Sequence, residues 1–409
     1  MLFRSNGVLA ALDVGSSKVA CIIGRNDASG LKVLGSALHE SHGVKSGTVT
    51  SLEAIKGSIL EAVDAAERLA DTRIQDVILS VQCGQPKTLQ GRAEKQLNGA
   101  LVSDAHLREL LSEGKRLCRE PGHETIQAAA TSYVVDQTRG VRDPRGMYCD
   151  RLGVTVHGVA LPQSPLQNLR LAIENCHLNI ARQLYAPYAS GLATLTADEM
   201  ALGATLIDLG AGVTSVAVFH DDALVYVDAV PLGGAHITSD IARMLTTPLP
   251  AAERIKSLYG SALADLETGS SDMIEVPQMG EDDTEGEHRV RRSLVTRIIQ
   301  SRMEEILIEV RDRLQKAGFD VVAGRRAVLT GGGCQLAGVR ELASRILNKQ
   351  IRLGRPQTFP GLAAATAGPA YSTALGLLIS GATTPPEANA PEVAEETQSE
   401  RREIGRAHV

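Results

Sequence analysis

The sequence predicts an α/β protein made of two similar lobes that face a shared cleft. Residues 12–23 and 206–219 follow one pattern: an apolar run ends at an aspartate, a glycine comes two positions later, and a second apolar or β-branched run begins. A third apolar run ends in a glycine turn at residues 331–333. Two separate copies of a strand–turn–strand pattern predict duplicated halves, each with a loop at the cleft.

The composition is that of a globular protein without nucleic-acid chemistry. A chain of 409 residues, 43% hydrophobic and 22% charged, can form two or more domains. A net charge of -6 and an aromatic content of 3% argue against a nucleic-acid partner. Six scattered cysteines without a CxxC pair predict reduced cytoplasmic thiols. No apolar run reaches the ~20 residues that span a bilayer.

The first half opens with three strands, a helix and a fourth strand. After the pattern at 12–23, residues 31–38 form an alternating apolar run. Ser51 is a helix N-cap, followed by apolar residues at helical spacing over 52–69. Residues 76–81 are apolar enough for a buried strand. The predicted order is therefore β-β-β-α-β.

A separate small module is expected between residues 84 and 158. Its sequence is polar and loop-rich around a helix at about 103–119, with strands near 128–135 and 152–159. This change in amino-acid composition predicts an insertion into the first half. A helix at 164–173, a strand at 179–185 and a helix from 187 then complete that half.

The second half repeats this alternation of strands and helices. After 206–219, the expected elements are a strand at 223–229, helices at 237–244 and 251–259, a short strand at 273–276, an amphipathic helix through 299–314, a strand at 326–330, and helices at 336–346 and 371–378. Residues beyond 381 are rich in Pro, Ala and Glu and are expected to form a linker.

The two ends are expected to be foreign to the natural chain. Residues 1–5 and 403–409 can be encoded by DNA strings of which one is the reverse complement of a segment of the other, and the string resembles a sequencing adapter. We therefore leave both ends out of the fold prediction. On this hypothesis the natural C-terminus is missing.

The glycine loops have the chemistry of a phosphate site. Backbone N–H groups in glycine turns can point at one oxyanion, because no Cβ blocks its approach. The loop residues that could do so are Gly15, Ser16, Ser17 and Lys18 in the first loop, Gly210, Ala211, Gly212, Val213 and Thr214 in the second, and Gly331, Gly332 and Gly333 in the third. Asp13 and Asp208 would repel phosphate unless a hydrated Mg²⁺ lies between them.

Each of these features alone has a simpler interpretation. A glycine turn is more often only a turn, Lys18 could be a surface lysine, and Glu253 with Lys256 could be an ordinary solvated pair. The repeated Asp-x-Gly turn together with the late glycine triplet is more specific. The P-loop string GxxxxGK[ST] is absent, and no GxGxxG follows the first strand. No histidine has metal-ligand spacing, so no further metal site is expected.

These motifs resemble those of the actin/Hsp70/sugar-kinase ATPase superfamily, and within it the FtsA family of bacterial cell-division proteins. The strings that carry the closer resemblance are residues 41–49, 140–147, 164–169 and 274–277. The resemblance runs from about residue 7 to residue 381. It implies an α/β, actin-like (ribonuclease H-like) duplicated two-lobe ATPase fold with a small subdomain inserted in the first lobe.

The resemblance also implies domain boundaries. The expected parts are a first-lobe core at 6–83 and 162–200, closed by a helix at 365–381; an inserted subdomain at 84–161; a second-lobe core at 201–240 and 321–364; a small second-lobe subdomain at 241–320; and a tail at 382–409.

The implied function is an ATP-binding cytoskeletal adaptor of cell division. Family members polymerise, bind the C-terminal peptide of the tubulin-like protein FtsZ through the small second-lobe subdomain, and bind other divisome proteins through the inserted subdomain. They lie on the cytoplasmic face of the inner membrane at the division site, held by a C-terminal amphipathic helix that this chain does not show. The alternatives are a pilus-assembly type actin-like ATPase and a sugar or metabolite kinase of the same fold; an Hsp70-like chaperone would need a large module after residue 381.

Site residues follow from the resemblance by position. Gly15, Ser16, Ser17 and Lys18 would face the phosphates, and Asp13 and Asp208 would lie near the metal. Residues 210–214 would form the second loop, Gly233 and Gly234 would lie near the ribose, Glu253 and Lys256 would flank the nucleoside, and Gly331, Gly332 and Gly333 would lie beneath it.

The second loop departs from the pattern of its relatives. Ala211, Val213 and Ser215 stand where relatives carry a glycine, a threonine and an acid. Ala211 keeps its amide, so ATP binding is expected to persist. The missing hydroxyl and carboxylate predict at most a slow ATPase, and no catalytic residue is identified.

Overall fold

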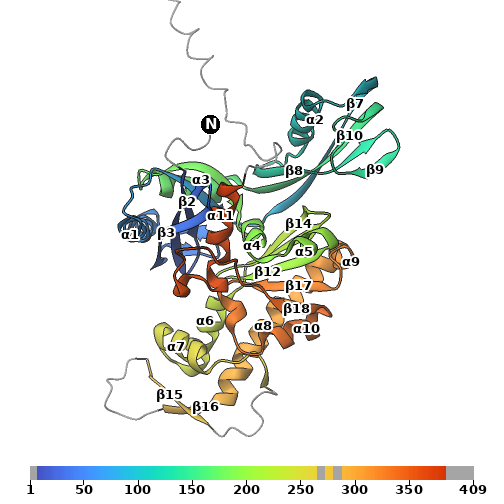
Figure 1. Cartoon of the computed structure of the whole chain (residues 1–409). Coiled ribbons are helices and arrows are strands. Elements are labelled where there is room, and N and C mark those ends of the chain that lie inside the picture. The colour runs from blue at the N-terminus through green and yellow to red at the C-terminus, as the bar shows by residue number, and fades with distance from the viewer. Residues whose placement is uncertain (1–6, 265–271, 280–287, 384–409) are drawn as a thin grey trace, which may run out of the picture.

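The computed structural model describes residues 7–264, 272–279 and 288–383. Two lobes lie one above the other, and a third module projects from the upper one (Figure 1). The predicted tail and both predicted foreign ends lie outside the described residues, apart from the start of the tail at 382–383.

The first lobe is built on a five-stranded sheet with the order β11-β6-β1-β2-β3. The strands are β1 (Val8–Val14), β2 (Lys18–Asp27), β3 (Gly30–Glu40), β6 (Asp76–Val81) and β11 (Asn179–Tyr185). β1, β2 and β3 form an antiparallel meander, whereas β6 and β11 join β1 in parallel. Asp13 is near the end of β1, opposite Ala20 of β2. The turn between these strands therefore lies at one edge of the sheet.

The second lobe repeats this topology with the order β14-β13-β12-β17-β18. The strands are β12 (Ala204–Leu209), β13 (Thr214–His220), β14 (Ala223–Val230), β17 (Arg326–Thr330) and β18 (Gln350–Leu353). Here too the first three strands are antiparallel and the last two run parallel to the first. Asp208 lies opposite Ser215 in the same register that pairs Asp13 with Ala20. The predicted duplication is confirmed.

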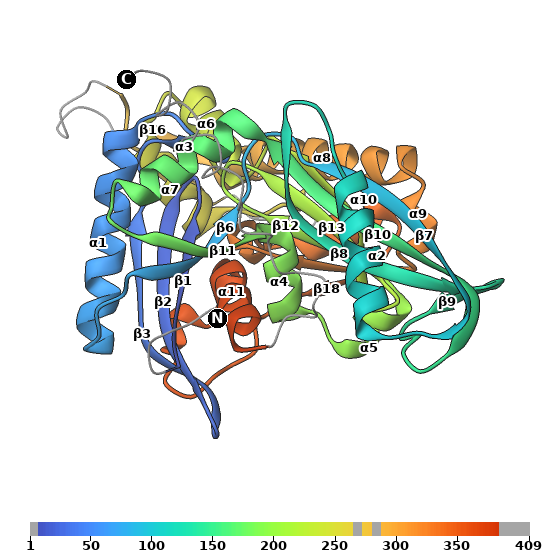
Figure 2. The same ribbon diagram turned by 90° about the horizontal axis from the view of Figure 1, so that it is seen from above.

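Helices cover both faces of the first sheet. α1 (Leu52–Ala70) and α3 (Gln163–Glu174) pack on the outer face (Figure 2). The Ser51 hydroxyl accepts the Ala54 amide, as the N-cap pattern predicts. A small hairpin of β4 (Val44–Lys45) and β5 (Thr48–Val49) precedes α1.

Two helices lie side by side between the sheets. α4 (Ala186–Thr194) and α11 (Ser372–Ala382) are in close contact, and α4 also touches β12 and β13 of the second lobe (Figure 2). Ala189 of α4 packs with Leu375 and Leu378 of α11 in one buried cluster. The chain thus returns to the first lobe at its end, as the sequence predicts.

The helices α5 to α10 belong to the second lobe. They are α5 (Ala197–Leu202), α6 (Gly234–Leu245), α7 (Leu249–Tyr259), α8 (Arg292–Lys316), α9 (Phe319–Val322) and α10 (Val339–Leu347). The apolar stripe of α8, including Ile299, Ile306 and Val310, is fully buried, so it packs the core as predicted. A short hairpin of β15 (Met273–Val276) and β16 (His288–Arg291) lies at the far end (Figure 1).

The inserted module is a four-stranded antiparallel sheet covered by one helix. Its order is β7-β10-β8-β9, with β7 (Lys87–Leu101), β8 (His123–Val135), β9 (Thr138–Val141) and β10 (Tyr148–Pro162), and α2 (Asp104–Leu117) packs on it. The prediction of a loop-rich start was wrong, because β7 is a strand of 15 residues. Two of its three buried positions hold the small residues Gly91 and Ala93, and the third holds Leu97. The alternation of buried and exposed positions in β7 is therefore only weakly visible as an alternation of large apolar and polar residues in its sequence.

The fold also bears on the state of the cysteines and on bilayer-spanning helices. All six cysteines are buried and free. Within the described ranges, none of the helices combines the length and apolar content that a bilayer crossing needs.

Candidate functional site

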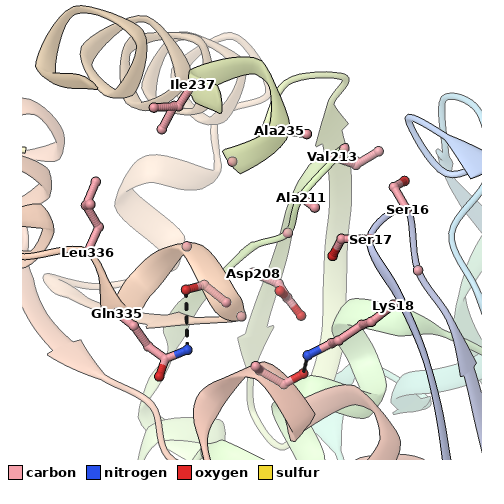
Figure 3. Close-up of a pocket in the computed structure, with 18 of the residues that line it drawn as sticks. Ser16, Ser17, Lys18, Asp208, Ala211, Val213, Ala235, Ile237, Gln335 and Leu336 are labelled. Atoms are coloured by element: carbon pink, nitrogen blue, oxygen red, sulfur yellow. Dashed lines mark hydrogen bonds between the residues drawn. The ribbon is translucent and has the colours of Figure 1, made fainter. Parts of the chain in front are cut away.

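A cavity of about 720 Å³ lies between the two lobes, where the glycine turns of both sheets meet. That volume is in the range of small-molecule sites. Figure 3 shows side chains from the first loop, the second loop, α6 and the turn after β17 around one space. The residues predicted from sequence that line it are Asp13, Gly15, Ser16, Ser17, Lys18, Asp208, Gly210, Ala211, Gly212, Val213, Gly234, Glu253, Lys256, Gly331, Gly332 and Gly333.

The first and second loops touch each other across the cleft. A Cβ on Gly212 would lie 2.5 Å from the Ser16 hydroxyl and 3.0 Å from the Cα of Ser46. The Ser16 hydroxyl also accepts the Gly47 amide at 3.0 Å. Only a glycine at position 212 therefore lets the loops approach this closely.

The third loop closes tightly under the second lobe's aspartate. Gly331 has a φ of +82°, and a Cβ there would lie 2.3 Å from Asp208 Oδ1 and 2.7 Å from the Leu209 carbonyl. A short helical turn, Gly332–Gln335, follows at once. Backbone amides and a half-buried carboxylate thus meet at one point of the cavity.

Two half-buried carboxylates flank the glycine loops. The Ser80 hydroxyl donates to Asp13 Oδ1 at 2.6 Å, and the Ser190 hydroxyl donates to Asp208 Oδ2 at 2.6 Å. Burial raises the pKa of Asp13, although the bond from Ser80 and the charge of Lys18 oppose the rise. Burial also raises the pKa of Asp208, against the bond from Ser190. Burial therefore disfavours the charged form of both carboxyl groups.

Lys18 is the cation nearest to this pair. Its Nζ donates to the Ala370 carbonyl and lies 4.6 Å from the centre of the Tyr371 ring. Burial lowers the pKa of Lys18, while Asp13 and Asp208 oppose the shift. Lys18 is therefore a partly buried residue of the cleft, not the surface lysine of the alternative interpretation.

Polar side chains of α6 and α7 form the opposite wall. Glu253 Oε2 accepts bonds from Lys256 Nζ at 2.7 Å and from the Thr238 hydroxyl at 2.5 Å. Lys256 also donates to the Gly234 carbonyl at 3.2 Å. The pair is thus tied to the start of α6 at the rim of the cavity.

Two predicted residues do not line the cavity. The Thr214 side chain is fully buried, and its hydroxyl donates to the Leu232 carbonyl at 2.9 Å. Gly233 packs instead on the second loop, where a Cβ would lie 2.4 Å from the Gly210 carbonyl. Thr214 was expected in the loop but starts β13, and Gly233 supports the loop from behind. The nucleotide contacts of the other residues stay predictions.

Several lining residues were missed by the sequence reasoning. Ser80 and Gln82 come from the end of β6, and Thr373 comes from the start of α11. The Thr373 hydroxyl lies 2.9 Å from that of Ser190 and 3.5 Å from Asp208 Oδ2. Nothing in their local sequence marks these residues, because tertiary packing alone brings them to the aspartates.

Ser215 has a definite partner across the cleft. The family resemblance implies an acid at this position, and the Ser215 hydroxyl accepts a bond from Gln82 Nε2. Asp13 and Asp208 are the carboxylates beside the phosphate loops, and no cluster of three or more His, Cys, Asp or Glu that could hold a metal occurs among the described residues. A cation here would rely on these two carboxylates, on water and on ligand oxygens.

The raised carboxyl pKa values give a testable pH dependence. A carboxyl whose pKa is higher in the folded than in the unfolded state makes stability fall as the pH rises from about 4 through the folded pKa. We expect Asp208→Asn to remove this loss and to raise the thermal unfolding midpoint of the ligand-free protein at pH 8 by about 2 °C. Calorimetry at pH 5 and pH 8 measures the unfolding midpoint, and the variant Asp150→Asn, at an exposed position, is the control. A lower midpoint at pH 8 for Asp208→Asn would contradict the burial argument.

Comparison with known proteins assigns this chain to a family. The family model described as "Cell division protein FtsA" matches residues 205–376, and that of the "SHS2 domain inserted in FTSA" matches residues 84–160. The cell division protein FtsA of Agrobacterium fabrum is 41% identical over 92% of this chain and 87% of its own length. The FtsA proteins of Neisseria meningitidis and Escherichia coli K12 are 35% and 28% identical, over 90% and 91% of this chain and 89% of their own lengths.

Solved structures show the same fold at low identity. A chain of the PilM–PilN type IV pilus biogenesis complex aligns with a TM-score of 0.65 at 17% identity, covering 93% of this chain and 100% of its own. MreB5 of Spiroplasma citri bound to AMPPNP aligns with a TM-score of 0.52 at 11% identity, covering 92% and 96%. The predicted actin-like fold with an inserted subdomain is confirmed.

Proposed function

This chain belongs to the FtsA family of cell division proteins, and on that premise we propose that its cleft binds ATP with Mg²⁺ and that the protein links FtsZ to the inner membrane. The observation that carries the nucleotide site is the meeting of three glycine loops around two half-buried aspartates. MreB5 of Spiroplasma citri, a neighbour in fold, has been solved with AMPPNP and with ADP. That likeness supports a nucleotide in the corresponding cleft.

The residues present fit a magnesium nucleotide. Asp13 and Asp208 are half-buried carboxylates whose pKa values are raised, and a cation between them would stabilise their charged forms. Ser80 and Ser190 hold the two carboxylates in place. Bound Mg²⁺ would supply charge neutralisation for the phosphates.

The loops would hold phosphate through the backbone. The Gly15 and Gly210 amides donate within their own turns, to the Lys18 carbonyl at 2.9 Å and the Val213 carbonyl at 3.1 Å, so these glycines shape the loops. The amides of Ser16, Ala211 and Gly212 would face the phosphates, and Lys18 adds a positive charge beside them. The turn at Gly332 adds backbone amides that favour anions, whereas the Gly234 and Ala235 amides at the start of α6 donate to carbonyls of the second loop. Glu253 and Lys256 at the rim would flank the nucleoside.

Nucleotide binding can be tested directly. We expect a fluorescent ATP analogue to bind with a Kd on the order of micromolar, and removal of Mg²⁺ with EDTA to weaken it at least tenfold, because the two aspartates would then repel the phosphates. Equal affinity with and without Mg²⁺ would exclude the proposed role of the aspartates.

Hydrolysis is expected to be slow. The second loop has Ser215 in place of an acid, and that hydroxyl is occupied by Gln82. With no free carboxylate base in this loop, we expect turnover below about 0.1 s⁻¹, against the 1–10³ s⁻¹ typical of enzymes. Phosphate release at saturating ATP measures it, and fast turnover would show that a base elsewhere in the cleft is used.

The small second-lobe subdomain is the proposed site for the FtsZ C-terminal peptide. Its α6, α7 and β15 region exposes several large apolar side chains, namely Met244, Leu249, Leu258, Tyr259, Met273 and Met279. Gathered apolar side chains on a surface are typical of a protein-binding site. Self-association into filaments and contacts of the inserted subdomain with other divisome proteins complete the proposal. The protein would lie on the cytoplasmic face of the inner membrane at the division site.

A surface variant tests the FtsZ site. We expect Met244→Glu with Met279→Glu to weaken binding of the FtsZ C-terminal peptide at least tenfold, because each change places a charge on the apolar surface. Leu202→Glu, also strongly exposed but on α5, is the control and should bind normally. Fluorescence anisotropy with a labelled peptide gives the affinities. Normal binding by the double variant would place the peptide elsewhere.

A further inference from the structure

The inserted module is rooted in the first lobe. Its strands β7 and β10 continue directly from β6 and into α3. Val159 and Leu161 of β10 belong to the same buried cluster as Leu166 and Ile173 of α3. Both ends of the module are therefore continuous with elements of the first lobe, and the same cluster also includes Val227 of β14.

The same module is hydrogen-bonded to the edge of the second lobe. The Thr88 hydroxyl donates to the Val227 carbonyl at 3.1 Å and accepts the Val227 amide at 2.9 Å. Gln85 Nε2 donates to Asp228 Oδ1 at 2.6 Å and to the Ala229 carbonyl at 3.1 Å. These bonds lie along β14, the edge strand of the second sheet. We call them the seam.

A surface ion pair extends the seam. Arg142, in the turn after β9, lies 2.7 Å from Asp222 and 3.7 Å from Asp221 in the turn between β13 and β14. Arg142 and both aspartates are exposed, so the pair is weak alone. It holds the outer part of the module to the same edge.

The seam is continuous with the nucleotide cleft. Gln82, three residues before Gln85, lines the cavity and bonds to Ser215 of β13. Asp228 also accepts Arg313 of α8 at 3.1 Å, and Met303 of that helix lines the same cavity. Segment 82–88 therefore connects the cavity wall, the second lobe and the module in one run of chain.

The buried face of the module next to β14 includes polar side chains beside the apolar Val159. Val154 and Val156 of β10 face α2, so strand alternation turns His157 to the opposite face, and Gln127 of β8 lies on that face as well. Both side chains are buried, and Gln127 Oε1 and His157 Nε2 have no hydrogen-bond partner among the described residues. Polar, incompletely paired contacts are typical of interfaces that rearrange.

We propose that the inserted module is a strap between the lobes, whose seam on β14 couples nucleotide occupancy of the cleft to the position of the module. A rotation of one lobe against the other must either break the seam or carry the module with it. By linkage, a partner that fixes the module would in turn change nucleotide affinity. The inference rests on the proposed nucleotide site.

Hydrogen exchange tests the strap on the full chain. Amide exchange of β7, β10 and β14 is measured with and without saturating ATP and Mg²⁺, and ATP affinity is measured separately. We expect ATP to slow exchange at β7 and β14 about fivefold. In the seam variant Gln85→Ala, Thr88→Val and Arg142→Ala, this response should fall below about twofold.

A matched control variant substitutes the same residue types at positions outside the seam. Gln96→Ala, Thr131→Val and Arg145→Ala change the same residue types inside the module, where Thr131 bonds to Thr155 and Arg145 to Asp104. This variant should keep the full response. Thr88→Val alone, which folds more readily than the triple variant, should show a reduced response.

The outcomes separate the two proposals. ATP binding without any change in exchange at β7 and β14 would overturn the strap and leave the nucleotide site intact. A full response in the seam variant would overturn it as well. Absence of ATP binding by the unmodified chain would overturn both.

Discussion

Replacing Gly331 by alanine is expected to destabilise the fold by about 2 kcal/mol and to lower ATP affinity at least 100-fold. The residue has a φ of +82°, which a residue with a Cβ rarely adopts, and the added carbon would lie 2.3 Å from Asp208 Oδ1. Relief of this overlap requires movement of Asp208 or of the strand end that carries it. Either movement would displace the proposed metal-binding carboxylate.

The neighbouring glycine supplies the matched control. Gly332 has no atom within 4 Å of its added Cβ and no positive φ. Gly332→Ala should therefore leave stability unchanged within about 0.5 kcal/mol. Because Gly332 lines the cavity, any loss of ATP affinity in this variant reports how closely the nucleotide approaches the backbone. Denaturant unfolding and ATP titration of both variants measure the two effects. Equal destabilisation by both would contradict the role of Gly331.

The core of the fold could be predicted because its signal is local. In residues 12–23 and 206–219 each apolar run, aspartate and glycine turn lie within about a dozen residues, so the strand–turn–strand pattern is legible. The helix from Ser51 could be predicted for the same reason, since its cap and its apolar spacing are both local. β7 could not, because it is an edge strand whose buried positions include only one large apolar residue, Leu97, beside Gly91 and Ala93.

The site was predictable only as far as its loops. The glycines and Asp13 and Asp208 belong to the repeated pattern, whereas Gln82 and Thr373 reach the cleft from the ends of other elements. Ser190 reaches Asp208 from the middle of α4. Thr214 was predicted to lie at the site but does not line the cavity. It follows the glycines in sequence, but strand pairing begins there and its side chain turns to the Leu232 carbonyl. A loop's neighbours in space depend on packing, which the sequence pattern does not contain.

Replacing Gly376 by alanine is expected to destabilise the protein by about 3 kcal/mol, although alanine is the better helix former. Gly376 is in the interior of α11, where a Cβ would lie 1.7 Å from the Ala189 carbonyl of α4. The two helices can touch at this point only through a glycine. Backbone atoms cannot yield as a flexible side chain would, so the helices must separate.

A glycine in another helix separates packing from helix propensity. Gly57 lies inside α1, and nothing is within 4 Å of its added Cβ. Gly57→Ala should therefore stabilise the protein by about 0.5–1 kcal/mol. Opposite signs for the two substitutions, measured by denaturant unfolding, are the expected result. A stabilising Gly376→Ala would show that the helices are not in close contact.

The same crossing determines the geometry of the nucleotide cleft. α4 carries Ser190 and α11 carries Thr373, and both hydroxyls point at Asp208 Oδ2. Separating the helices would remove these donors from a carboxylate that is half-buried, which leaves its charge without hydrogen bonds. We therefore expect Gly376→Ala to weaken Mg²⁺-dependent ATP binding as well, by about tenfold. If ATP affinity stayed unchanged while stability fell, Asp208 would hold its position without the crossing helices.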